Sequence, residues 1–362
     1  MGLGTGRVEA LTSYVARLAA AHLVKPSWLL GEVAVYISAN SARVLNGACA
    51  TTVAIVKAVE DATTMAPLAG LTLLPFKKVM SSINSLASTQ RWCPRCLREW
   101  QLSGIPPHWP LLWCLTTVRW CERHQCQLAS YCPNPDCGLP ADLFAPPGRC
   151  RWCGSWLGLD EADPNQADPN DASDVWFTDA SSRLLQFGQD ERTILTPEHM
   201  QRVFRWFFEV VGNGSWDGLR KRLGFSSAIV YSWRTGRALP SLDMFLTFCH
   251  RLNLEPEDLL NPDAFERLNA EAIQAASFSH RRAAPRRTNR HPDLRQAREF
   301  LERTLQLELS CAPGLNQVAD DLCVGSQVLR YHFPELARAV SHRWHAGARE
   351  RSRICHSLRS AI

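Results

Sequence analysis

The chain has 362 residues, of which 46% are hydrophobic and 21% are charged. This composition suffices for two or three packed domains and is too apolar for a wholly disordered protein. Forty Lys and Arg against 35 Asp and Glu give a net charge of only +5, which is a weak argument for nucleic-acid binding. No apolar run approaches the roughly 20 residues that span a bilayer, and residues 1–10 lack an export signal, so we expect a soluble cytoplasmic protein without a membrane partner.

The first part of the chain, residues 1–90, is predicted to be mainly helical. Its apolar residues recur at the i, i+3, i+4, i+7 spacing of a helix with one buried face: Leu11, Tyr14, Val15 and Leu18. A second apolar-rich segment covers residues 42–59, and Pro26, Pro67 and Pro75 punctuate this part of the chain. We therefore expect several short helices before the cysteines begin.

A cysteine-rich block follows at residues 91–157. It holds nine of the 14 cysteines and seven of the 13 tryptophans, with frequent Pro and Gly and no clean periodicity. Such a stretch needs a cross-link to stay folded. Because nothing in the sequence predicts export to an oxidising compartment, we expect metal-bound β and loop elements here rather than a disulfide scaffold.

The rest of the chain is predicted to consist of two helical domains and two linkers. Residues 158–192 carry an acidic tract with a repeated Ala-Asp-Pro-Asn and are interpreted as a linker. Residues 193–265 are predicted to form a helix-turn-helix domain, residues 266–290 an Arg-rich linker, and residues 291–362 a second helix-turn-helix domain. The expected fold class is thus mainly α, with small zinc-bound β and loop elements.

Two residue pairs with the same spacing predict a first metal site. Cys93-Pro-Arg-Cys96 is followed 24 residues later by Cys121-Glu-Arg-His124. Each pair forms a tight knuckle with two soft donors, and together they make a tetrahedral Zn²⁺ site of three cysteines and one histidine. Cys126 could replace His124, although its spacing from Cys121 is less favourable, and Cys114 is left over.

A second set of cysteines predicts an all-cysteine Zn²⁺ site. Its four donors are Cys132, Cys137, Cys150 and Cys153. With four protein ligands each, neither metal keeps an open position for water or substrate, so both are expected to be structural. No nucleophile with its base and no open-site ligand set can be named, so we expect no enzyme and no catalytic residue.

Residues 216–260 carry the pattern of a DNA-binding helix-turn-helix. Residues 217–223 predict a first helix, Gly224-Phe-Ser-Ser227 a turn, and residues 228–234 a second helix that ends at Gly236. On this geometry five side chains would face DNA: Ser226, Ser227, Tyr231, Arg234 and Arg237. The alternative is a helical bundle that packs on protein.

Residues 315–333 repeat this arrangement, with a turn at Cys323-Val-Gly-Ser326. The exposed candidates for DNA contact are Gln327, Arg330 and His332. The preceding Arg-rich tract includes Arg281 and Arg282, whose planar guanidinium groups suit phosphate. Packing on protein is again the alternative.

Taken together, these features resemble the TniQ/TnsD family of transposon target-selection proteins. The residues that carry the resemblance are Leu11-Thr-Ser-Tyr-Val-Ala-Arg-Leu-Ala19, Leu29-Leu30, Cys93-Pro-Arg-Cys96, Cys121-x-x-His124, the cysteine set ending at Cys153, and the tail His332-Phe-Pro-Glu-Leu336. The resemblance places a TniQ domain at residues 1–157, with a helical part at 1–90 and a double zinc-binding part at 91–157. The sequence departs from the family at Glu122, where Pro is usual, and at Gln125, where Gly is common.

The resemblance implies a non-catalytic adaptor that marks the insertion site and recruits the AAA+ ATPase regulator TnsC. Two ways of finding the target stay open. TnsD-like members bind a defined attachment sequence, whereas members from CRISPR-associated transposons bind a guide-RNA surveillance complex, Cascade. Target DNA, Cascade, TnsC and a second copy of the chain are therefore the expected partners, and a free-standing transcription regulator is the alternative from another class.

Overall fold

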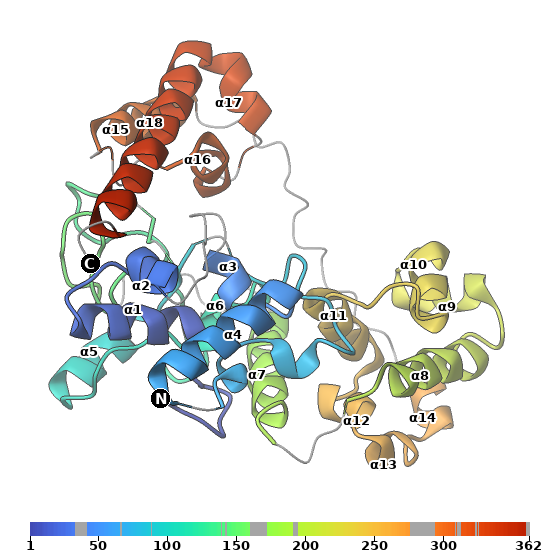
Figure 1. Ribbon diagram of the computed structural model, residues 1–362. Coiled ribbons are helices and arrows are strands. Elements are labelled where there is room, and N and C mark those ends of the chain that lie inside the picture. Colours follow the sequence, from blue (N-terminus) through green and yellow to red (C-terminus); the bar gives the residue numbers. More distant parts are fainter. Residues whose placement is uncertain are drawn as a thin grey trace. The chain divides into compact units, whose positions relative to one another are not determined.

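The computed structural model describes residues 1–32, 42–65, 67–87, 89–138, 140–141, 143–159, 172–190, 195–275, 294–307, 309, 313–322, 324 and 326–359. The chain divides into a larger compact unit up to Arg281 and a smaller one from Arg282 onwards (Figure 1). The described residues are mostly helical, with a single two-stranded antiparallel sheet. The predicted fold class, mainly α with small β and loop elements, is confirmed.

Short helices form the first part of the larger unit, as the apolar spacing predicts. They are α1 (Leu11–Ala21), α2 (Pro26–Glu32), α3 (Ala42–Leu45) and α4 (Ala50–Thr63), followed by the 3-10 turns η2 (Ala69–Leu71) and η3 (Leu74–Phe76). The predicted stripe on α1 is buried at Leu11 and Val15. On α4, Ile55 and Val59 are buried.

The cysteine-rich block forms α5 (Pro94–Leu102), α6 (Leu111–Cys114), β1 (Trp120–Cys121) and β2 (Cys126–Gln127). Its core consists of large aromatic rings rather than a periodic apolar stripe. Trp92, Trp109 and Trp113 are fully buried, and the Trp92 and Trp109 rings lie 6.4 Å apart. The Trp92 and Trp109 indole nitrogens donate to the carbonyl oxygens of Leu157 and Ala145, so both ends of the block close on this core.

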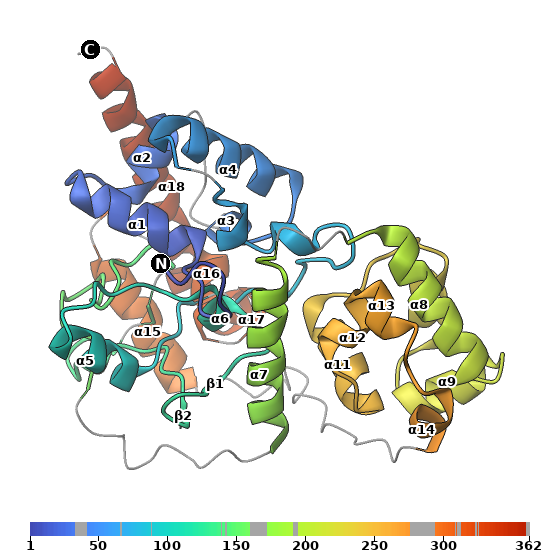
Figure 2. The ribbon, with the colours of Figure 1, turned by 90° about the horizontal axis from the view of Figure 1, so that it is seen from below.

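The second half of the predicted acidic linker is a packed helix, α7 (Ala172–Phe187), which corrects the linker prediction for residues 158–192. Its buried residues Phe177, Ala180 and Leu184 follow helical spacing, but small polar residues between them weaken the apolar signal. The helix packs on α6 and β1 and on two later helices, α11 (Leu242–Leu252) and α12 (Pro256–Leu260), as Figure 2 shows. Residues 160–171, with the Ala-Asp-Pro-Asn repeat, lie outside the described residues.

The helices after α7 belong to the same compact unit and are not a separate domain. They are α8 (Pro197–Val210), α9 (Trp216–Leu223), α10 (Ser227–Arg234), α11 (Leu242–Leu252), α12 (Pro256–Leu260), α13 (Pro262–Phe265) and α14 (Ala270–Ala275). Phe204, Phe207 and Phe248 are buried together, with Trp233 on Phe204. Since α14 occupies residues 270–275 and buries Ile273, the predicted linker at 266–290 begins with ordered structure.

The smaller unit contains α15 (Leu294–Gln306), α16 (Leu315–Asp321), α17 (Ser326–His332) and α18 (Pro334–Arg359). Each helix contributes to one core, in which Leu301, Val318, Leu329 and Val340 are almost fully buried. Among the described helices, none combines the length and the apolar character that crossing a bilayer requires.

Candidate metal centres and nucleic-acid interface

Two knuckles bring the first predicted donor set together. Cys93 caps the N-terminus of α5, where its sulfur accepts a hydrogen bond from the Cys96 backbone nitrogen at 3.4 Å. Cys121 ends β1, and His124 lies in the turn that leads to β2. The ligand atoms of these four residues all lie within 4.8 Å of one another.

The distances between the donors fit a tetrahedral metal ion. The Nδ1 atom of His124 lies 3.4 Å, 3.3 Å and 3.7 Å from the sulfurs of Cys93, Cys96 and Cys121. The sulfurs of Cys96 and Cys121 are 3.7 Å apart. Zn–S bonds of about 2.3 Å and Zn–N bonds of about 2.0 Å place tetrahedral ligand atoms about 3.3–3.8 Å apart.

Charged residues around the first centre orient its donors. Glu99 Oε1 lies 2.8 Å from His124 Nε2, and its other oxygen pairs with Arg123 at 2.8 Å. The hydrogen bond between Glu99 and Nε2 leaves Nδ1 as the imidazole nitrogen that is free to bind the metal. On the other side, the Arg7 guanidinium donates to the Cys96 sulfur at 3.3 Å, which suits a thiolate.

The two positions where the sequence departs from the family both lie beside this centre. Glu122 pairs with Arg7 at 3.5 Å, so it joins the charged surround of the donors. Gln125 has a φ of +45°, in the left-handed region that favours glycine. The backbone conformation explains why Gly is common there, and the structure accommodates Gln125 without moving His124 out of the donor set.

The second donor set forms a separate centre from two further knuckles. Cys132, Cys137, Cys150 and Cys153 place their sulfurs within 4.8 Å of one another. The Cys132 and Cys153 sulfurs are 3.6 Å apart, and those of Cys137 and Cys150 are 3.8 Å apart. Cys153 is the exposed member of the set.

Both donor sets suit zinc by their chemistry. Three thiols with an imidazole, and four thiols, are the soft and borderline donors that Zn²⁺ takes in closed tetrahedral sites. When bound, the ions would cross-link segments that share little regular structure. Cys114 takes no part: its sulfur lies 3.8 Å from the Pro110 carbonyl oxygen, and burial raises the pKa of its thiol to about 12.

The first predicted helix pair is present as α9 and α10. Leu219, Leu223, Val230 and Trp233 are buried, and Ile229 is half-buried. Gly224, between the helices, has a φ of +64°, which only glycine adopts without strain.

The predicted contact residues of this pair gather at α10. Ser226 and Arg237 are exposed, Tyr231 is 38% exposed, and Arg234 is half-buried. The Arg234 guanidinium lies 4.7 Å from the centre of the Phe208 ring, and that of Arg237 lies 5.3 Å from the Tyr231 ring. The side chain of Ser227 lies outside the described residues.

The second predicted helix pair is present as α16 and α17. Gln327, Arg330 and His332 are all exposed on α17. The predicted turn is described only in part, because Cys323 and Gly325 are not among the described residues, and the same holds for Arg281 and Arg282.

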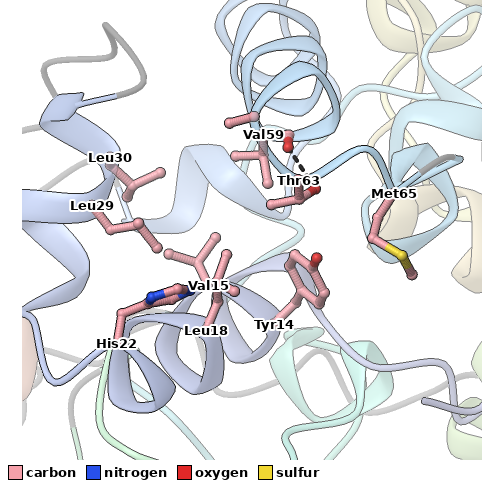
Figure 3. A pocket seen from close by; sticks show the side chains of 10 residues that line it. Tyr14, Val15, Leu18, His22, Leu29, Leu30, Val59, Thr63 and Met65 are labelled. Atoms are coloured by element: carbon pink, nitrogen blue, oxygen red, sulfur yellow. Dashed lines mark hydrogen bonds between the residues drawn. The ribbon is translucent and has the colours of Figure 1, made fainter.

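A pocket of about 330 Å³ opens between α1, α2 and α4 (Figure 3). Its lining is mostly aliphatic and includes Val15 and Leu18 of α1 and Leu29 and Leu30 of α2. The hydroxyl of Thr63 already donates to the Val59 carbonyl oxygen at 2.7 Å. The described lining residues include two titratable side chains, Tyr14 and His22, and no carboxylate.

The donor sets and the helices around them define a class of protein: mainly helical chains whose cysteine-rich segment is organised as two metal-binding knuckle pairs. The family model TniQ matches residues 1–128, which confirms the resemblance to this family over that part of the chain. The TniQ family consists of non-enzymatic adaptors associated with transposition. No curated protein matches the chain.

The matched region ends between the two metal centres. It includes all four donors of the first centre and none of the second. Residues 129–362 therefore carry structure that the family match does not describe: the second centre, α7 and the two helix pairs.

Several residues around the candidate sites escape sequence reasoning. Glu99 follows Cys96 by one helical turn on α5, which is a signal that could have found it as a partner of a metal ligand. Phe208, under Arg234, precedes it by 26 positions and carries no comparable signal. Tyr331, 83% exposed between Arg330 and His332, could have been found by counting exposed aromatic residues on the predicted helix.

Proposed function

We propose that this chain is a target-selection adaptor for DNA transposition, which connects a target site to the AAA+ regulator TnsC. The observation that carries the proposal is the TniQ match at residues 1–128, because this family is associated with transposition. The two closed donor sets support a scaffold role, since a metal with four protein ligands has no position left for substrate.

The exposed edge of α10 is the proposed DNA contact. Arg234 is the last residue of α10, Arg237 follows three positions later, and both guanidinium groups stack on aromatic rings. Stacking holds the long side chains extended, so less conformational entropy is lost when they bind. A basic side chain at the end of a recognition helix can reach a phosphate or a guanine edge.

The mode of targeting has two forms within this proposal. In the first, the α9–α10 and α16–α17 pairs bind a defined DNA sequence directly. In the second, the chain binds a guide-RNA Cascade complex, and the same helices mediate docking or a homodimer. Half-buried Arg234 at the end of α10, exposed Arg237 just after it and exposed Arg330 on α17 favour the first form.

The salt dependence of DNA binding separates the two forms. We expect the affinity for duplex DNA, measured by fluorescence anisotropy between about 50 and 300 mM salt, to fall steeply as arginines displace counterions. Arg237→Ala should weaken binding for all sequences and reduce the salt slope by about 1, and Arg234→Ala should cost about 1–3 kcal/mol on the preferred sequence.

The matched control is Arg151→Ala, because Arg151 is also exposed and stacks on an aromatic ring, Trp152, in the cysteine-rich block. This substitution also removes one positive charge, but it should leave unchanged both the affinity for duplex DNA and the salt dependence of that affinity. A flat, weak response of the unmodified chain would favour the Cascade-bound form instead.

Contact with the ATPase tests the adaptor role itself. We expect the chain to co-purify with the AAA+ protein encoded beside it and to bring that protein to DNA carrying the target. A chain that binds paired half-sites as a dimer and never associates with the ATPase would instead be a free-standing transcription regulator.

A further inference from the structure

A fifth sulfur lies beside the first metal centre. Cys126 begins β2 and stands directly opposite Cys121 across the two-stranded sheet. Its side chain is 5% exposed, and its sulfur lies 3.6 Å from the sulfur of Cys93. Cys126 therefore contacts one of the three thiols that His124 contacts, and the strand pairing places it opposite a second, Cys121.

The geometry offers five donors where a tetrahedral zinc ion takes four. A separation of 3.6 Å between the Cys126 and Cys93 sulfurs is close to the edge of a ZnS₄ tetrahedron, about 3.8 Å. The backbone of Cys126 is fixed by strand pairing, so a small side-chain movement brings its sulfur towards the position that His124 Nδ1 holds. Cys114, the other cysteine of the block outside the donor sets, has no such neighbours.

We propose that Cys126 is a reserve ligand of the first centre. It replaces His124 and completes an all-thiolate site with Cys93, Cys96 and Cys121. In the exchange the Cys126 thiol releases its proton to solvent and binds as thiolate, while the imidazole leaves in its neutral form. The chain thus has a structural centre that keeps its metal when the histidine is lost.

The first test is the metal content of purified full-length variants. His124→Ala should hold as much zinc per chain as the unmodified protein, because Cys126 takes the fourth position. Adding Cys126→Ser to His124→Ala should lose one zinc per chain. The matched control adds Cys114→Ser instead and should keep the full zinc content. Equal zinc in the first two variants, whether both full or both depleted, contradicts the proposal.

The number of thiolate ligands can be measured from the absorption spectrum of the protein loaded with Co²⁺ in place of zinc. The sulfur-to-metal charge-transfer absorption of His124→Ala should exceed that of the unmodified chain by the contribution of one thiolate. An unchanged absorption would mean that water, rather than Cys126, fills the position.

A second measurement needs no histidine variant. It tests whether Cys126 binds the metal even if His124→Ala does not fold. Cadmium is softer than zinc and prefers thiolate ligands. In the unmodified chain loaded with ¹¹³Cd²⁺, we expect both resonances at the shift of all-thiolate sites. In Cys126→Ser one resonance should move to the position of a three-sulfur, one-nitrogen site. Identical spectra of the two proteins overturn the proposal.

Discussion

Glu99 acts on the first metal centre through His124. Its carboxylate accepts a hydrogen bond from Nε2, while Arg123 holds the second oxygen. The bond fixes the imidazole tautomer and makes Nδ1 a better donor, although Glu99 itself lies outside the donor set. Its effect should therefore appear in metal affinity rather than in fold.

Removing this contact should weaken the first centre selectively. We expect Glu99→Ala to lower its zinc affinity by about 10- to 100-fold, the usual cost of losing an outer partner of a ligating histidine. Competition with a chelator measures the affinity of each centre. The control is Asp61→Ala on α4, which removes a paired carboxylate that is exposed and lies outside both donor sets. Equal affinities in all three proteins would contradict the role given to Glu99.

Glu9 is a fully buried carboxylate that ties the start of the chain to α1. Burial alone would raise the pKa of Glu9, but hydrogen bonds from Arg17 and Ser13, the Arg17 charge and the amino terminus outweigh it and hold the pKa below its ordinary value. A depressed pKa means that the carboxylate stabilises the fold above about pH 4.5, its usual value, and that this contribution is lost as the pH falls below it.

Replacing Glu9 should remove this pH dependence. We expect Glu9→Gln to cost about 1–3 kcal/mol of unfolding free energy at pH 7, because Arg17 loses a charged partner. The cost should shrink as the pH falls through the acid range. Denaturant unfolding at a series of pH values measures it, with Glu302→Gln, in an exposed pair on α15, as control. A cost that does not change with pH would contradict this account.

At the scale of single elements, α7 holds the larger unit together. It contacts α6 and β1 of the cysteine-rich block on one side and α11 and α12 on the other. Thr117 and Ser181 add a buried hydrogen bond of 3.0 Å between the block and the helix. Since this helix lies between two cores, a cavity in it should destabilise both.

Leu184 of α7 tests this coupling. We expect Leu184→Ala to cost about 2–5 kcal/mol, because the side chain is fully buried and the space cannot collapse easily. Hydrogen exchange should show lower protection both in the cysteine-rich block and in α11. Gln186→Ala, at an exposed position of the same helix, should change neither. Loss of protection on only one side of α7 would contradict the coupling.

Helices with a periodic apolar stripe and a clear first residue could be predicted from the sequence. Helices whose buried face contains polar residues could not. The helix over residues 197–210 follows from Pro197 and its apolar stripe. The α7 helix was missed because Thr178 and Ser181 are buried through hydrogen bonds, which the apolar pattern does not encode. The metal donors follow from spacing, whereas their outer partners depend on how the turns fold.

For the whole molecule, the metals should decide whether residues 91–157 are folded. Structural zinc contributes about 10 kcal/mol or more per site in small zinc-bound domains. We expect chelation to abolish the near-ultraviolet circular dichroism of the buried tryptophans, Trp92, Trp109 and Trp113 among them. The smaller unit, whose core contains no donor set among its described residues, should keep its hydrogen-exchange protection. Retained tryptophan signals in a metal-free chain would contradict the scaffold role.

The segment at residues 81–85 is fastened directly to the start of α11. Ser81 donates its backbone N–H to the Pro240 carbonyl oxygen at 2.8 Å, and the Leu242 backbone nitrogen donates to Ser85 Oγ at 3.3 Å. These two hydrogen bonds hold α11, on which α9 packs, directly against the part of the chain that the TniQ model matches. If α10 binds the target DNA and the TniQ domain binds the ATPase, the distance between the two binding sites is fixed by the fold. Every insertion should then occur at the same number of base pairs from the bases that α10 contacts.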